Sequence, residues 1–93
     1  MEDTIREILT EIRANRVFDS HFIILKLIRD HSDSYLDYAS QINTPSQRTA
    51  VVHANIGQII TRFEGSLVER LHFESSSYNI HGNVNDCACW RKL

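Results

Sequence analysis

The residues best suited to chemistry are two cysteines and two histidines in the last third of the sequence. Cys87 and Cys89 are separated by one residue, and both point to the same side if their segment is a strand. His72 and His81 would lie on or near the facing strand. Thiolates and imidazoles are the usual tetrahedral ligands of zinc, but structural sites generally use CxxC spacing. Because alternate side chains on a strand are ~7 Å apart, we expect two reduced thiols and no metal site.

Histidines also stand beside aspartates, a pairing that suits general-base catalysis. His21 follows Asp19 by two positions. His31 lies between Asp30 and Asp33. A reaction would also need a nucleophile, a glycine-rich phosphate loop or a second poised carboxylate, and the sequence presents none of these in a recognisable pattern. We therefore expect no enzymatic activity, no cofactor and no small-molecule substrate.

The most unusual local string is Asn79-Ile80-His81-Gly82-Asn83, in which side-chain amides surround one glycine. A loop of this composition offers donors and acceptors to a nucleotide base or to a protein partner. Asparagine in turns also commonly bonds to its own backbone. The sequence leaves both interpretations open, a binding tip or a self-contained turn.

A large aromatic residue stands beside two cations near the C-terminus, in Trp90-Arg91-Lys92. On a strand, Trp90 would alternate away from the cysteines, so we expect its ring to cover the helical layer. If the ring is exposed instead, aromatic and basic side chains together favour stacking on bases and contact with phosphates.

Apolar residues at helical spacing predict the elements that must position these candidates. We expect helices at about 3–14, 20–31 and 45–64, and a short helix ending near residue 40. Thr44-Pro45 is a strong start for the last helix and Gly65 a suitable end. Two β-like segments, 66–73 and 87–93, flank a turn-rich stretch and predict a hairpin. The fold class is therefore mainly α, with four helices followed by a small C-terminal β-hairpin.

The second helix is apolar nearly all round, so it must be covered on several sides by its own chain or by a partner subunit. Only a narrow stripe, Lys26, Arg29 and Asp30, is polar. The expected core is Ile5, Ile8, Leu9, Ile12, Phe22, Ile23, Leu27, Ile28, Leu36, Val52, Ile56, Ile59, Ile60, Phe63, Leu71 and Trp90.

A short helix, a turn, a longer helix and a β-hairpin resemble the element order of winged helix-turn-helix domains, over about 32–73 and 87–93. The resemblance implies a recognition helix beginning at 44–48 and a wing at 75–86, with double-stranded DNA as the partner. The implied groove contacts are Ser46, Gln47 and Arg48. The implied phosphate contacts are Arg70, His72, His81, Arg91 and Lys92.

The outer face of the fourth helix favours a different function. It carries Ala50, Ala54 and Gly57, small residues that let another helix approach closely. Two functions remain open: a small DNA-binding or regulatory module of winged-helix type, and a protein-interaction module that forms a homodimer. DNA binding needs the basic residues on one face. Dimerisation needs exposed apolar surface on the first or second helix, or the small face of the fourth.

Length and composition bound the class of protein. The chain has 93 residues, of which 42% are hydrophobic and 24% charged, values ordinary for one globular domain. Its net charge of −2 is less basic than nucleic-acid-binding domains usually are. No stretch approaches the ~18 apolar residues of a membrane span. We expect a cytoplasmic protein with a single domain over residues 1–93.

Overall fold

The computed structural model describes residues 1–93, apart from the side chain of Pro45. Three helices and a short strand are followed by a 3₁₀ turn, a fourth helix and two long strands. In chain order the elements are α1 (Glu2–Glu11), β1 (Val17–Asp19), α2 (Ser20–Asp30), α3 (Ser32–Ser40), η1 (Pro45–Gln47), α4 (Arg48–Thr61), β2 (Val68–Tyr78) and β3 (Val84–Lys92).

The strands form one antiparallel sheet in the order β1–β3–β2, which makes β3 the central strand. The predicted mainly α fold with a two-stranded C-terminal hairpin is therefore wrong, and the protein is α+β. The third strand, β1, comes from the segment before α2 and pairs Phe18 with Trp90. Asn15, at a φ of 72°, turns the chain into β1. Its N–H donates to the carbonyl of Lys92 at 2.7 Å, which begins the pairing.

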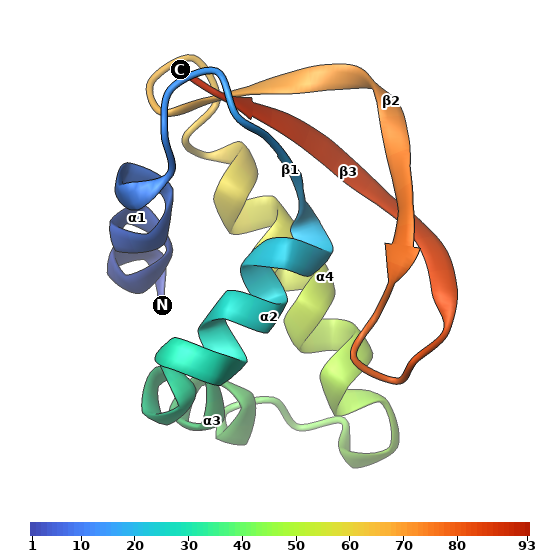
Figure 1. Cartoon of the computed structure of the whole chain (residues 1–93). Coiled ribbons are helices and arrows are strands. Elements are labelled where there is room, and N and C mark those ends of the chain that lie inside the picture. The colour runs from blue at the N-terminus through green and yellow to red at the C-terminus, as the bar shows by residue number, and fades with distance from the viewer.

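The β2–β3 hairpin is longer than the sequence predicts. Its pairing runs from Val68 opposite Lys92 to Tyr78 opposite Val84, with a register shift between Arg70 and Glu74. Such a bulge bends a strand, and Figure 1 shows β2 turning sharply along its length. The hairpin reaches from the end of the molecule that holds the C-terminus to the N-terminal end of α4 (Figure 1).

The hairpin tip is a turn closed by its own amides. Asn79 Oδ1 accepts hydrogen bonds from the backbone N–H of His81 at 2.9 Å and of Asn83 at 3.1 Å. Gly82 adopts a φ of 79°, which a glycine reaches without steric cost. Of the two interpretations offered by the sequence for residues 79–83, Asn79 supports the self-contained turn, because its side chain binds the backbone of the turn.

The helical expectations hold in outline but not at the boundaries. α1 ends at Glu11 rather than near residue 14, and the predicted fourth helix divides into η1 and a shorter α4 that ends at Thr61. Gly65 lies beyond this end at a φ of 86°. Its N–H donates to the carbonyl of Val68 at 2.8 Å, which links the helix end to β2. Within the described chain, no helix combines the length and apolar character needed to cross a membrane.

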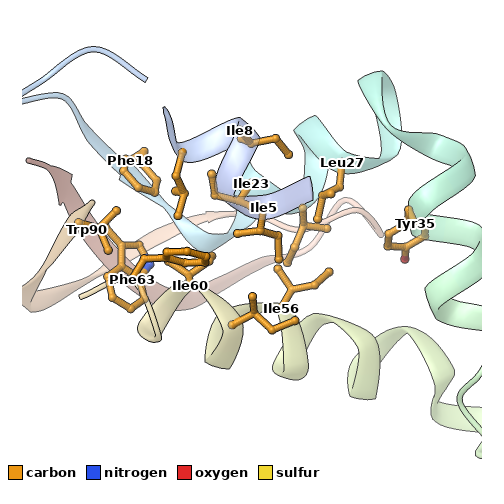
Figure 2. Close-up of a cluster of buried hydrophobic side chains, with 14 of the residues drawn as sticks. Ile5, Ile8, Phe18, Ile23, Leu27, Tyr35, Ile56, Ile60, Phe63 and Trp90 are labelled. Atoms are coloured by element: carbon orange, nitrogen blue, oxygen red, sulfur yellow. The ribbon is translucent and has the colours of Figure 1, made fainter. Parts of the chain in front are cut away.

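One hydrophobic core lies between the helices and the sheet. Figure 2 shows Ile60 of α4, and Phe63 just beyond its end, beside Trp90 of β3. Trp90 is completely buried, and its Nε1–H donates to Ser20 Oγ at 3.3 Å. The expectation that this ring covers the helical layer is confirmed. Three core predictions are wrong. Phe22 and Leu36 are 44% and 62% exposed, and Leu71 is only partly buried and lies outside the core cluster.

Candidate functional site

The residues predicted to bind nucleic acid fall into two groups at opposite ends of the hairpin. Ser46, Gln47 and Arg48 are exposed at the start of α4. His81, at the hairpin tip, reaches the same place, since its Nε2 lies 3.5 Å from Thr49 Oγ1. The structure thus brings four of the eight residues to one end of the molecule.

Of the other four residues, His72 is exposed on β2, whereas Arg70, Arg91 and Lys92 lie at the base of the hairpin and are engaged within the protein. The guanidinium of Arg70 lies 5.3 Å from the centre of the Trp90 ring. Arg91 forms an ion pair with Glu69. Lys92 is only 7% exposed, and its Nζ donates to the carbonyl of Ile12 at 2.8 Å. These cations stabilise the fold and do not join the tip residues on one face.

A polar cluster that the sequence did not predict lies where β1 meets α2. Asp19 is the N-cap of α2, and its Oδ1 accepts from the N–H of Phe22 at 2.8 Å. Its Oδ2 accepts from the hydroxyls of Ser75 at 2.7 Å and Ser77 at 2.8 Å. One carboxylate therefore joins the helix start to the far half of β2.

His21 extends this cluster. Its Nδ1 lies 2.7 Å from Ser77 Oγ. Since the Ser77 proton is donated to Asp19, the remaining role of Ser77 Oγ is to accept the Nδ1–H of His21. Cys87 on β3 completes the group, because ligand atoms of Asp19, His21 and Cys87 all lie within 4.8 Å of one another.

The cluster shifts the pKa values of Asp19 and Cys87 in opposite directions. Burial alone would raise the pKa of Asp19, but hydrogen bonds from Ser75, Ser77 and Phe22 outweigh it and lower the pKa below its ordinary value. Burial, together with the Asp19 carboxylate, raises the pKa of Cys87. Asp19 is therefore ionised and Cys87 is a neutral thiol near neutral pH.

A cleft of about 500 Å³ opens beside this cluster, between α4, the start of α2 and the hairpin. The small residues Ala50, Ala54 and Gly57 of α4 line it, so the outer face of the fourth helix looks onto the hairpin. His21, His53, His81 and Cys87 line it too. We call it the hairpin cleft.

His53 belongs to the wall of the hairpin cleft but is already bonded. Its Nε2 lies 2.9 Å from the hydroxyl of Tyr35. Burial lowers the pKa of His53, and the neighbouring His81 and His21 lower it further. His53 is therefore neutral near pH 7.

The four residues weighed as zinc ligands from sequence do not converge. Cys89 is buried at 4% exposure, whereas His72 is exposed on β2. Among the side chains that the structure describes, the only group of three or more metal-type ligands is Asp19, His21 and Cys87. Two of its members, Asp19 and His21, are two positions apart in the sequence. No sequence pattern links them to Cys87 before the register of the sheet is known.

The outward face of α2 is apolar and uncovered. The chain buries Ile23, Ile24 and Leu27, but Phe22 and Leu25 are 44% and 54% exposed. We refer to Phe22 and Leu25 as the α2 face. The sequence signal for this face was the apolar character of α2 nearly all round. Figure 1 shows α2 between α1 and α4.

A groove of about 550 Å³ adjoins the α2 face, between the end of α1, β1 and α2. Ile8, Ile12 and Phe18 line it, and Phe22 forms one wall. Arg13 and Arg16 also border it. Phe22 joins this α1–α2 groove to the α2 face, whereas Leu25 borders a smaller pocket on the side of the hairpin tip.

Comparison with known proteins assigns no family to this chain. No family model, curated protein or solved structure matches it. The choice between the two functions therefore depends on the surfaces described above.

Proposed function

We propose that this protein is an interaction module that associates with a second copy of itself through the α2 face. The observation that carries the proposal is the exposure of Phe22 and Leu25, at 44% and 54%, on a helix whose residues Ile23, Ile24 and Leu27 are buried in the core. Contiguous exposed apolar surface that adjoins a groove is typical of interaction sites. Homodimerisation requires such a surface on the first or second helix, and α2 supplies it.

A second copy fits this surface because the protruding side chains of the α2 face and the α1–α2 groove lie side by side. In a two-fold symmetric dimer, the same patch faces itself, so a protruding side chain needs a recess on the same patch. Leu25 of one copy would enter the α1–α2 groove of the other, whose apolar lining includes Ile12 and Phe18.

Charges at the two ends of α2 favour an antiparallel arrangement of the two copies. Arg13 and Arg16 border the groove beside the start of α2. Asp33 and Asp37 are exposed on α3, just beyond the end of α2. Antiparallel α2 helices would bring Arg13 and Arg16 of each copy toward Asp33 and Asp37 of the other, which favours association in that orientation.

Sedimentation velocity across a wide concentration range tests the proposal. Wild type should show reversible association to a dimer. Replacing both Phe22 and Leu25 with lysine should raise the dimer Kd at least about thirtyfold, since a central apolar contact contributes roughly 2 kcal/mol or more. Circular dichroism would establish that the variant is folded.

Phe73→Lys is the matched control, because Phe73 is also a large apolar residue, 62% exposed, but lies on β2. It should leave the Kd unchanged. Loss of association with Phe73→Lys and not with the α2 variant would place the interface on the sheet edge and refute the proposed surface. A wild type that is monomeric at every concentration would refute self-association.

Nucleic-acid binding is the second candidate, favoured by the meeting of the hairpin tip with the start of α4. Arg48 is exposed there beside Ser46 and Gln47, and the His81 to Thr49 contact completes the surface.

Fluorescence anisotropy with random-sequence duplex DNA should then show binding that weakens steeply with salt. Arg48→Ala should weaken it by about 5- to 150-fold, the equivalent of 1–3 kcal/mol. Arg29→Ala on α2 is the control, and absence of binding at low salt would reject this candidate.

A further inference from the structure

Three metal-type ligands from three elements converge at one edge of the hairpin cleft. They are the carboxylate of Asp19 at the end of β1, a ring nitrogen of His21 in the first turn of α2, and the thiol sulfur of Cys87 on β3. The three ligand atoms lie within 4.8 Å of one another. The sheet register creates this group, since Cys87 pairs with Ser75, whose hydroxyl binds Asp19.

The donor set suits a borderline divalent ion. Oxygen, nitrogen and sulfur together are the ligands that zinc accepts, whereas magnesium and calcium select oxygen alone. Tetrahedral bonds of about 2.0–2.3 Å separate ligand atoms by about 3.4–3.8 Å. The present ligand atoms lie within 4.8 Å of one another, so the group must close by up to about 1 Å around the ion.

The surrounding hydrogen bonds already orient the ligands. Asp19 is held by the N–H of Phe22 and by the hydroxyls of Ser75 and Ser77. The Nδ1 of His21 is held by Ser77 at 2.7 Å, which fixes the plane of the ring. Hydrogen bonds of this kind to ligating carboxylates and imidazoles are the usual outer shell of a metal site.

We propose that Asp19, His21 and Cys87 bind one divalent ion of the zinc class, with the remaining coordination position open to the hairpin cleft. His21 and Cys87 both line this cleft, so an ion between them has space of about 500 Å³ on its free side. Three protein ligands and one open position are the pattern of zinc sites that accept an exogenous ligand, whereas purely structural sites use four protein ligands. Binding releases the proton of the Cys87 thiol to solvent, and the ion then balances the charges of the resulting thiolate and the Asp19 carboxylate, which lie close together in a partly buried place.

Cobalt(II) is the direct probe, because its absorption reports both thiolate ligation and tetrahedral geometry. Metal-free protein titrated with cobalt(II) should develop a thiolate charge-transfer band that saturates at one equivalent and is displaced by zinc(II). Cys87→Ser should abolish the band and weaken zinc binding at least about tenfold. Cys89→Ser should retain both, since Cys89 is buried two positions along β3 and is not in the group.

A second measurement does not depend on any substitution. Zinc(II) should slow alkylation of Cys87 in the wild-type protein, followed by mass spectrometry of the Cys87 site. His21→Gln should remove that protection while Cys87 stays present. The proposal is overturned if cobalt(II) gives no charge-transfer band, if Cys87→Ser and Cys89→Ser bind zinc equally, or if zinc(II) leaves the alkylation rate unchanged.

Discussion

Replacing Trp90 with alanine is expected to lower the free energy of unfolding by about 3–5 kcal/mol. The side chain is completely buried against α4, and its removal leaves a cavity and breaks the hydrogen bond that Ser20 Oγ accepts. A domain of this length has a total stability of roughly 5–14 kcal/mol, so the variant would be barely folded. Urea unfolding followed by far-ultraviolet circular dichroism measures the effect, since the protein has one tryptophan and loses it here.

Trp90→Phe separates the two causes. It keeps most of the ring volume and removes the Nε1–H that binds Ser20. We expect a loss of about 1–2 kcal/mol from one lost hydrogen bond and a smaller cavity. Equal destabilisation by Phe and Ala would contradict the packing role assigned to the ring.

Asp19→Ala is expected to lower the free energy of unfolding by about 2–3 kcal/mol. It removes the N-cap of α2 and leaves the hydroxyls of Ser75 and Ser77 without their acceptor. Thermal and urea unfolding measure the loss. Asp30→Ala is the matched control, because Asp30 is exposed and pairs only with Lys26 and Arg29, so it should have a much smaller effect.

Acid should reduce the contribution of Asp19 to the free energy of unfolding. The folded-state pKa of Asp19 lies below its ordinary value, so its contribution is complete above the unfolded carboxyl pKa of about 3.9. It is lost as the pH falls through the lower folded pKa. The stability difference between wild type and Asp19→Ala should therefore shrink below about pH 4. A difference that stays constant into strong acid would show that the charge of Asp19 does not matter.

The helices were predictable because their signals are local. Residues three and four positions apart lie on one face, so Ile5, Ile8 and Leu9 mark α1 without knowledge of the rest of the chain. α2 was predicted to within one residue at its end, since its cap at Asp19 precedes a long apolar run.

The sheet and the polar cluster depend on contacts that are distant in sequence. β1 has only three residues, too few for a recognisable alternation, and it exists because β3 pairs with it. The meeting of Asp19 with Ser75 and Ser77 depends on the register beyond the bulge in β2. No local pattern encodes that register, so the sequence suggested instead a cysteine pair as the metal candidate.

The exposure of Phe22 shows the limit of helical projection. Projection predicted correctly that α2 is apolar nearly all round, but it could not show which sides the chain would cover. α1, α4 and the sheet cover the sides that carry Ile23 and Leu27, and the side with Phe22 and Leu25 is left open. Phe22, which was wrongly predicted to be buried in the core, thus belongs to the proposed interface.

Amide chemical shifts recorded on dilution test the α2 interface most directly. As a dimer dissociates, shifts should change at Phe22 and Leu25 and along the α1–α2 groove, including Ile12 and Arg16, and should stay constant along β2. Each amide reports its own surroundings, so the result locates the surface and detects association in one experiment. Changes confined to β2 or to the hairpin tip, or no change with concentration at all, would contradict self-association through the α2 face.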